Sequence, residues 1–406
     1  MKIAVIGGGA AGFFAAIHAA DQSNHDVVLF ESTAKLLSKV RISGGGRCNV
    51  THACFNPAEL CEAYPRGGKE LRQSFSRFMT GDTVRWFEEH GVELKTESDG
   101  RMFPRSDDSA SIVDCLFTAA EDAGVEIRTG DPVDALVKKP DGFSIDLRSG
   151  KSFLFDRVIV ATGGHPKIEG FHWIARLGHA IESPVPSLFT FNIPDRNLNA
   201  LMGVAVEQAT VSLPECHVET TGAVLLTHWG LSGPAVLKAS SIGARQLAGL
   251  SYRFKVVVDW LPGESVDDTM IWFEEGRTTS GTVRVRNRIP DGLPRRLWEY
   301  LVNEAGIIES ANWADLSKEQ MKRLAALLHE QQIRAQGKTT FKEEFVTCGG
   351  VSLREVDFKT MESKLVKGLF FAGEVLDIDA VTGGYNFQAA WTTGYLAGLS
   401  AAQKHD

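Results

Sequence analysis

The stretch that decides the fold stands near the amino terminus and reads Ile3-Ala4-Val5-Ile6-Gly7-Gly8-Gly9-Ala10-Ala11-Gly12. Its four apolar residues predict a short buried strand, and the alanine-rich stretch that follows, to about Asp21, predicts a helix. Gly7 permits a tight turn out of the strand, Gly9 lets a phosphate approach the backbone, and Gly12 lets the helix pack closely on the strand. The pattern is typical of the phosphate-binding turn of a dinucleotide-binding domain.

The next apolar run, 27–30, predicts a second strand that ends at Glu31, 19 residues after Gly12. A carboxylate at this distance accepts hydrogen bonds from ribose hydroxyls and disfavours a 2′-phosphate. Ala10 and Ala11 open the helix, whose first N–H groups and partial positive charge suit a pyrophosphate. The motif therefore predicts FAD or NAD, and it does not by itself separate the two.

Features further along the chain favour FAD. Residues 133–155 predict a three-stranded meander with turns at 140–142 and 148–150, and 157–164 predict a buried strand that leaves through Thr162 and Gly163. A meander inserted before a returning parallel strand is the layout of FAD domains of the glutathione-reductase type, by fold-level analogy. No second Gly-x-Gly-x-x-Gly follows a strand, so a dedicated NAD(P)H domain is not expected.

The carboxyl-terminal part predicts a second grip on the cofactor. Residues 368–371 predict a strand that runs into Gly373, Glu374 and Asp377. Gly384, preceded by a second glycine, then opens a helix that extends to about residue 399. A helix amino terminus aimed at the pyrimidine end of a flavin stabilises the negative charge of the reduced ring, by about 0.3–1 kcal/mol.

Composition bounds the function class. The 406 residues include 43 Lys and Arg against 51 Asp and Glu, a net charge of -8, so the chain lacks the overall charge of a nucleic-acid binder and nucleic acid is not an expected partner. The six cysteines are widely spaced without Cys-x-x-Cys, which predicts reduced thiols and no metal site. Glycines interrupt the first apolar run, and no run is long enough to span a bilayer, so we expect a cytoplasmic protein without membrane contact.

The pattern changes between 189 and 342. Strands are predicted at 204–213, 223–226 and 253–260, and helices at 264–275, 295–303 and 317–335, the last with Ser317 and Gln320 as a capping box. Ser232 is predicted to cap a helix that has Pro234 in its first turn. The expected fold is α/β: a Rossmann-like FAD-binding domain of glutathione-reductase type (1–188 and 343–406), with a parallel sheet and a β-meander, and an inserted β-rich domain (189–342) that carries a small helical unit and supplies the substrate pocket.

Three long segments resemble a bacterial flavoprotein family, known as aminoacetone-oxidase-family or BaiN-like FAD-binding enzymes. The segments are 41–51 (RISGGGRCNVT), 227–234 (THWGLSGP) and 346–388, which runs from Val346-Thr347-Cys348-Gly349-Gly350 to Gly383-Gly384-Tyr385-Asn386-Phe387-Gln388. The resemblance covers nearly the whole chain. It implies an oxidoreductase with FAD and an inserted domain, and it does not fix the reaction.

The resemblance implies that eight residues lie against the cofactor: Ala11, Glu31, Gly45, Gly46, Val133 (through its backbone, pairing with adenine), Glu374, Asn386 and Phe387. The other candidate cofactor residues are Gly7, Gly9, Ala10, Gly12, Lys39, Ser43, Arg47, Cys48, Thr162, Gly163, Gly373, Asp377, Gly384 and Tyr385. Within 43–49 the three glycines permit close backbone approach, and Arg47 can fork onto a phosphate or a flavin carbonyl. The alternative for Arg47 is a surface ion pair.

The candidate catalytic residues are His228, Arg47 and Asn49. His228 can shuttle protons near neutral pH, or it is a hydrogen-bonded packing histidine. The expected activity is hydride transfer between flavin N5 and a small organic substrate, either as a reductase that uses NAD(P)H transiently or as an oxidase that uses oxygen. Two alternatives are a flavin-dependent tRNA-modifying protein and a flavin redox sensor without turnover. The sequence does not indicate the oligomeric state.

Overall fold

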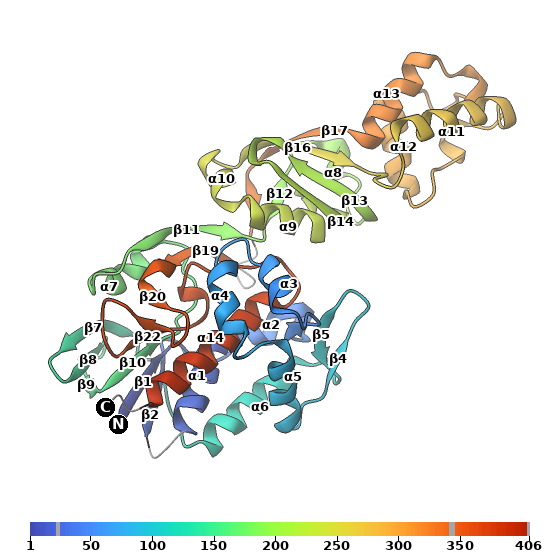
Figure 1. Cartoon of the computed structure of the whole chain (residues 1–406). Coiled ribbons are helices and arrows are strands. Elements are labelled where there is room, and N and C mark those ends of the chain that lie inside the picture. Colours follow the sequence, from blue (N-terminus) through green and yellow to red (C-terminus); the bar gives the residue numbers. More distant parts are fainter. Residues whose placement is uncertain (22–24, 341–345, 404–406) are drawn as a thin grey trace. The chain divides into compact units, whose positions relative to one another are not determined.

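The computed structural model describes residues 1–21, 25–340 and 346–403 (Figure 1). The chain forms two compact units, 1–187 with 342–406 and 188–341. Each unit has a hydrophobic core of its own. The far boundary of the expected insert, between 342 and 343, falls outside the described residues.

The first unit is built on a seven-stranded sheet in which five neighbouring strands run parallel. β1 lies between β10 and β2, with Val5 opposite both Ile159 and Leu29, so the motif-bearing strand is the central one of the five parallel strands. The strands across the sheet are β20 (Val356–Asp357), β21 (Glu362–Ser363), β22 (Leu369–Phe371), β10 (Arg157–Val160), β1 (Lys2–Ile6), β2 (Asp26–Glu31) and β6 (Glu126–Thr129). The carboxyl ends of the five parallel strands therefore share one edge, where an open α/β sheet binds its ligands.

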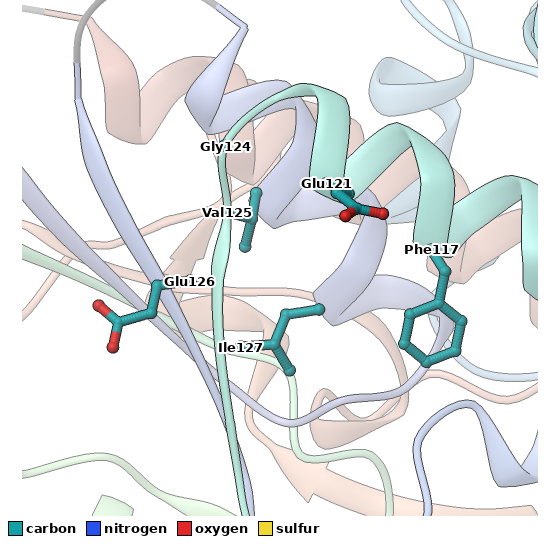
Figure 2. A pocket seen from close by; sticks show the side chains of 6 residues that line it. All are labelled: Phe117, Glu121, Gly124, Val125, Glu126 and Ile127. Atoms are coloured by element: carbon teal, nitrogen blue, oxygen red, sulfur yellow. The ribbon is translucent and has the colours of Figure 1, made fainter.

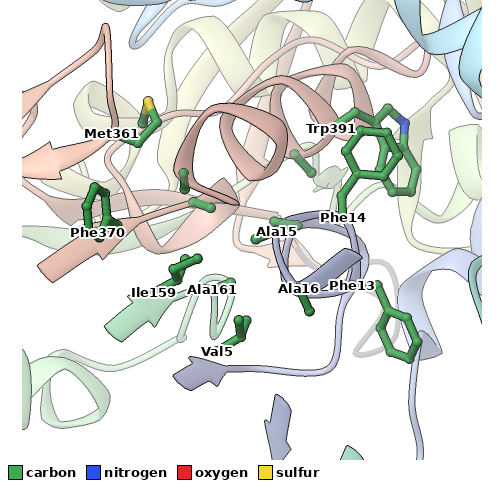
Figure 3. Close-up of a cluster of buried hydrophobic side chains, with 14 of the residues drawn as sticks. Val5, Phe13, Phe14, Ala15, Ala16, Ile159, Ala161, Met361, Phe370 and Trp391 are labelled. Atoms are coloured by element: carbon green, nitrogen blue, oxygen red, sulfur yellow. The ribbon is translucent and has the colours of Figure 1, made fainter. Parts of the chain in front are cut away.

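Two helices from opposite ends of the chain, α1 (Ala10–Ala20) and α14 (Tyr385–Ala402), pack against each other and contact the sheet. Their contact is close, because a Cβ on Gly398 would lie 2.5 Å from the Ala15 carbonyl oxygen. Figure 3 shows the surrounding apolar cluster, in which Phe14 lies 5.2 Å from Trp391 between ring centroids. The first and last parts of the chain thus form one core.

The predicted meander is present as β7 (Val133–Lys139), β8 (Gly142–Leu147) and β9 (Ser152–Phe155). The Phe155 ring packs edge-on against Phe30 of β2, 5.8 Å between centroids. The remaining elements of this unit are α2 (Ser38–Gly46), β3 (Thr51–His52), α3 (Pro57–Glu62), α4 (Gly68–Phe75), α5 (Thr80–Glu89), β4 (Leu94–Thr96), β5 (Arg101–Pro104), α6 (Ser109–Asp122), α7 (His172–Ala175), β11 (Ile181–Ser187) and β19 (Val346–Val351). The predicted fold class, an α/β FAD-domain fold with parallel sheet and meander, is confirmed.

The second unit has an antiparallel seven-stranded sheet and six helices among its described residues. Its strands, in order across the sheet, are β17 (Gln331–Gln336), β16 (Arg253–Asp259), β13 (Ala205–Leu213), β14 (Val218–Leu226), β15 (Gly230–Ser232), β12 (Thr190–Asn192) and β18 (Lys338–Thr339). The helices are α8 (Arg196–Asn199), α9 (Pro234–Ile242), α10 (Ala244–Gly249), α11 (Val266–Thr279), α12 (Arg295–Glu304) and α13 (Lys318–His329).

Two local predictions in this unit are wrong. The helix predicted over 317–335 ends at His329, and Gln331–Gln336 form the strand β17. Pairing with β16 overrides the continuing helical pattern, since Gln331, Ile333 and Ala335 bury one face of the strand. Ser232 does not cap α9: it belongs to β15, and Gly233 is the N-cap, with a φ of 95° that glycine accommodates.

Candidate functional site

The glycines of the amino-terminal motif build a turn that leaves room for a ligand. Gly7 has a φ of 118°, and a Cβ there would lie 2.3 Å from the Ala161 carbonyl oxygen. A Cβ on Gly12 would lie 1.8 Å from the Gly7 carbonyl oxygen, whereas a Cβ on Gly9 would meet no atom within 4 Å. Gly9 is the N-cap of α1 and no side chain caps this helix, so the first N–H groups of α1, including those of Ala10 and Ala11, are available to an anion.

Glu31 ends β2 beside this turn. Its Oε2 accepts a hydrogen bond from the Gly8 N–H at 2.8 Å, and its Oε1 accepts one from the Thr33 N–H at 2.9 Å. The carboxylate is therefore held at the edge of the sheet next to the turn. The hydroxyls of Ser32 and Thr33 also donate to Oε1, so Oε2, which accepts one hydrogen bond, is the oxygen that suits a ribose hydroxyl.

A second open turn forms the end of α2, where the backbone of Ser43, Gly44 and Gly45 departs from helical geometry. Gly44, Gly45 and Gly46 have φ values of 60°, 70° and 85°, a conformation that favours glycine. A Cβ on Gly45 or Gly46 would meet nothing within 4 Å, while one on Gly44 would contact Phe103 and Asn49. The turn is closed by the Cys48 N–H, which donates to the Ser43 carbonyl at 2.9 Å. A ligand can therefore lie directly against the backbone of two residues.

Asn49 joins this turn to the amino terminus of α14. The orientation of its amide that satisfies both ends has the side-chain oxygen accepting from the Gly384 N–H at 2.9 Å and the nitrogen donating to the Thr51 carbonyl at 3.0 Å. Gly384 is the N-cap of α14, with a φ of 94°, and no side chain caps the helix. The open turn and a second uncapped helix terminus are thus neighbours. Asn49 has a positioning role for the turn and the helix terminus, because its side-chain amide is hydrogen-bonded to backbone groups.

The first turn of α14 is held by its own contacts. The Tyr385 ring stacks on His52 with 4.5 Å between centroids, and its carbonyl accepts a hydrogen bond from the Tyr64 hydroxyl at 2.6 Å. Burial, with a smaller effect of Cys54, raises the pKa of Tyr385 to about 12. Asn386 accepts from the Ala380 N–H at 3.0 Å.

Glu374 is the centre of a third group of contacts. Its Oε2 pairs with Lys39 Nζ at 2.6 Å, and its Oε1 accepts from the Thr347 N–H at 2.7 Å. A Cβ on Gly164 would lie 2.3 Å from Thr347 Oγ1, and one on Gly163 would meet nothing within 4 Å. The buried Thr347 hydroxyl has no hydrogen-bond partner among the described residues. A buried polar atom of this kind requires an explanation, such as a ligand that supplies the partner.

Thr347 is absent from the sequence-based candidates. The residue type gives no signal, because threonine is common in strands and its neighbour in space, Glu374, is 27 residues away. Only the three-dimensional structure shows the unpaired hydroxyl. The repeated glycines after it, Gly349 and Gly350, are the nearest indication in the sequence that the segment is constrained.

Several candidates have other neighbours. The Arg47 guanidinium pairs with Glu97 at 2.6 Å and lies 3.9 Å above the Phe103 ring, so the alternative of a surface ion pair describes its contacts. The thiol of Cys48 is buried, and burial raises its pKa to about 12. Cofactor roles for these two residues stay predictions that depend on their backbone or on a change of partner.

The remaining candidates are placed as follows. Ala11 and Gly373 contact each other, since a Cβ on Gly373 would lie 2.8 Å from the Ala11 Cβ. Val133 is the first residue of β7 in the meander. Thr162 lies in the loop after β10, two residues past the end of the strand. The list is completed by buried Asp377, whose N–H donates to the Val351 carbonyl at 3.1 Å, and Phe387, whose ring stacks on Trp391 at 5.8 Å.

His228 lies in the second unit, in the turn between β14 and β15. Its side chain is exposed and its ring lies 4.3 Å from that of the exposed Trp229. The alternative role, a hydrogen-bonded packing histidine, requires a buried side chain, and the His228 side chain is exposed. Its catalytic role stays a prediction.

A surface hollow of about 430 Å³ lies elsewhere in the first unit, at the end of α6 and the start of β6 (Figure 2). It is lined by Phe117, Glu121, Gly124, Val125, Glu126 and Ile127. Because β6 is parallel to β1, its first residues lie at the edge of the sheet away from the carboxyl ends. The hollow is therefore not part of the site formed by the glycine turns.

In the part of the chain that the structure describes, no group of three or more His, Cys, Asp and Glu side chains is arranged to hold a metal ion. Among the same residues, no helix combines the length and the apolar character needed to cross a bilayer.

The residues present fit FAD. An extended dinucleotide needs groups that bind its phosphates, its ribose and its ring. The first unit offers two uncapped helix termini, glycines with open space before them, a carboxylate at the end of β2 and an unpaired buried hydroxyl near Glu374. Fold and site together define an FAD-dependent oxidoreductase.

The chain belongs to the family described as "HI0933-like protein Rossmann domain", whose sequence model matches residues 1–400. This confirms the family that the three segments predicted. Among curated proteins it is similar to the 3-dehydro-bile acid delta(4,6)-reductase of Clostridium scindens, 30% identical over 99% of each chain. It is 31% identical to the ribosomal RNA dihydrouridine synthase of Escherichia coli, over 96% of this chain and 95% of the relative, and 29% identical to that of Haemophilus influenzae, over 98% of each.

Among solved structures, the chain resembles a 3-ketosteroid-delta4-(5alpha)-dehydrogenase from Rhodococcus jostii RHA1 in complex with 4-androstene-3,17-dione. The TM-score is 0.53 at 14% identity, over 99% of this chain and 97% of the other. At this identity the likeness supports the fold alone.

Proposed function

We propose that the protein is an FAD-dependent reductase that adds hydrogen across a carbon–carbon double bond conjugated to a carbonyl group. FAD, when bound, supplies hydride at N5. One observation carries the proposal: the names of three curated relatives describe this chemistry. A 3-dehydro bile acid with delta(4,6) bonds is a conjugated ketone, and dihydrouridine is uridine with the ring double bond beside its carbonyl reduced. This supports the reductase version of the predicted activity over the oxidase version and over a sensor without turnover.

Reduction of the double bond also needs a proton, which is added to the carbon that does not receive the hydride. Tyr385 is the proton donor that the geometry favours, because it stands in the first turn of α14 and its hydroxyl makes no hydrogen bond to any described residue. With a pKa of about 12, it keeps its proton at neutral pH. His228, in the second unit, is the other candidate donor.

The binding roles follow the contacts. We propose that the first N–H groups of α1 hold the pyrophosphate, that Glu31 accepts from the ribose, and that Gly45 and Gly46 lie against the flavin with Asn49 fixing their position. Arg47 then acts by holding this turn through Glu97. The second unit, 188–341, supplies the substrate pocket.

The electron donor is NAD(P)H, taken up transiently. No second glycine-rich dinucleotide turn follows a strand in the sequence, so the nicotinamide nucleotide reaches the flavin without a domain of its own. The substrate is either a free small molecule, as the sequence predicted, or a uridine in RNA, which two relatives favour. We place the reaction in the cytoplasm.

Two anaerobic measurements test the proposal. In the first, NADH and NADPH are titrated into the yellow protein, and we expect one of them to bleach the flavin absorbance. In the second, the reduced protein is mixed with 4-androstene-3,17-dione, with 2-cyclohexen-1-one, with unmodified ribosomal RNA, and with cyclohexanone as the saturated control. We expect a conjugated substrate, and not cyclohexanone, to restore the yellow colour. Reoxidation by oxygen alone would overturn the proposal.

A further inference from the structure

The sheet of the second unit carries three cations on its outward face. Arg253 and Lys255 are on β16 and Arg334 is on β17, while the residues between them, such as Phe254 and Ile333, point into the core. Arg253 and Arg334 are exposed and Lys255 is half-buried. We call these three residues the β16–β17 basic cluster.

The cluster places like charges side by side. Lys255 stands directly opposite Arg334 in the antiparallel register, where two like charges destabilise a sheet. None of the three makes an ion pair with a carboxylate among the residues that the structure describes. The nearest acid that contacts the cluster is Glu215, and its Oε1 accepts the backbone N–H of Lys255 at 3.0 Å. The repulsion is therefore not relieved by side-chain pairing.

Protection of a sheet edge does not account for the cluster. Charged residues on an edge strand prevent pairing with other chains, and this explains Arg334, because β17 is the outermost strand. Arg253 and Lys255 lie one strand further in, between β17 and β13. The cluster thus extends over the face of the sheet, where an external anion would stabilise it.

On β17 the neighbours of the cluster are uncharged hydrogen-bonding side chains. Gln336 stands opposite Arg253, and Gln332 precedes Arg334 on the same exposed face of β17. Further along this face, Thr210 and Ser212 of β13 stand opposite Asp259 and Val257 of β16, and the Ser212 hydroxyl donates to Glu219 at 3.0 Å. These acidic side chains thus lie beyond the cluster. Amides and hydroxyls suit the sugar hydroxyls and base edges of RNA, whereas a lipid surface would favour apolar side chains beside the cations.

We propose that the β16–β17 basic cluster binds the phosphate backbone of a structured RNA and thereby presents a uridine as the substrate. The inference rests on the proposed reductase function and names the carrier of its conjugated double bond. Residues two apart on a strand are separated by about 6.8 Å and neighbouring strands by about 4.8 Å, so the three cations can reach successive phosphates of one strand. The net charge of -8 does not oppose this, because binding depends on the local cluster.

The test compares two triple variants of the full-length, FAD-containing protein. One carries Arg253→Gln, Lys255→Gln and Arg334→Gln. The control carries Lys318→Gln, Lys322→Gln and Arg323→Gln on α13, which removes the same number of positive charges from the same unit. Binding of fluorescein-labelled ribosomal RNA, transcribed in vitro, is measured by anisotropy at several KCl concentrations.

We expect the cluster variant to bind RNA about 10-fold or more weakly at moderate salt, with the slope of log K against log[KCl] reduced by about 2, since each phosphate contact contributes about 0.7. The control should change less than about 2-fold. Equal weakening of both variants, absence of RNA binding by the wild type, or binding to phosphatidylglycerol vesicles in place of RNA would overturn the inference. Bleaching by NAD(P)H, measured on the same samples, reports separately on the reductase function.

Discussion

At the scale of the residue, removal of the unpaired hydroxyl of Thr347 should have opposite effects on two quantities, the stability of the FAD-free protein and its affinity for FAD. Replacing Thr347 by Val removes a buried polar atom that has no partner among the residues that the structure describes, so the FAD-free protein should gain about 1 kcal/mol or more in stability. If FAD supplies the missing partner, the same change should weaken FAD binding by about 5- to 10-fold, the worth of one hydrogen bond. Thermal unfolding of the FAD-free form and fluorescence titration with FAD measure the two effects. Thr347→Ser, which keeps the hydroxyl, should retain FAD affinity; equal affinity of the Val variant would exclude the contact.

His18 predicts how stability depends on pH. It is buried in α1, donates from Nδ1 to the Phe14 carbonyl at 2.7 Å, and packs against Tyr395, and burial lowers its pKa from 6.5 to about 4. The unfolded chain therefore binds a proton that the folded chain refuses, and stability falls as the pH drops from 6.5 towards 4, by about 3 kcal/mol in total. Urea denaturation at a series of pH values measures this. His18→Gln should flatten the slope in that window, and an unchanged slope would contradict the assignment.

Residue roles differ in how far the sequence predicts them. Gly7, Gly9 and Gly12 act through the backbone of one short segment, so their spacing is sufficient to predict the turn. Arg47 was ambiguous because its partner, Glu97, is 50 residues away and nothing in the local pattern selects it. The unpaired hydroxyl of Thr347 required the whole three-dimensional environment.

At the scale of the element, the close crossing of α1 and α14 predicts an intolerance of side-chain volume. A Cβ on Gly398 would lie 2.5 Å from the Ala15 carbonyl oxygen, so Gly398→Ala must separate the helices and should cost about 1–3 kcal/mol. Gly249→Ala is the matched control, because this glycine ends α10 with nothing within 4 Å, and there alanine should be neutral or stabilise by up to about 1 kcal/mol. Urea unfolding of both variants tests the contrast, and similar stabilities would show that the crossing tolerates a methyl group.

Helices and strands are predicted best from the sequence where a single spacing of apolar residues dominates a segment. The strands β1, β2 and β10 and the meander follow from continuous apolar runs and Gly-containing turns. The pattern of α13 continued past His329 in the sequence, yet Ile333 and Ala335 belong to β17, because pairing with β16 decides the conformation there. Only Ile333 and Ala335 are apolar in 331–336, too few residues for the hydrophobic pattern to separate a strand from a continuing helix, so the sequence alone does not place this boundary.

At the scale of the whole molecule, the two units with separate cores predict two unfolding steps. All the glycine turns, uncapped helix termini and acidic residues that fit FAD lie in the unit formed by 1–187 and 342–406. A ligand stabilises only what it binds, by RT ln(1 + [L]/Kd), or about 2.7 kcal/mol at a concentration 100-fold above Kd. Differential scanning calorimetry of the full-length protein should therefore show two transitions, of which added FAD raises only one.

The assignment of the two transitions can be checked with variants placed in each unit. Gly398→Ala should lower the transition that FAD raises. Ser317→Ala, which removes the cap of α13 in the second unit, should lower the other by about 1 kcal/mol, because Ser317 Oγ accepts from the Gln320 N–H at 3.2 Å. A single transition that FAD shifts as a whole, with both variants lowering it, would mean that the two cores unfold as one cooperative unit. In that case, occupation of the cofactor site would also stabilise the β16–β17 sheet.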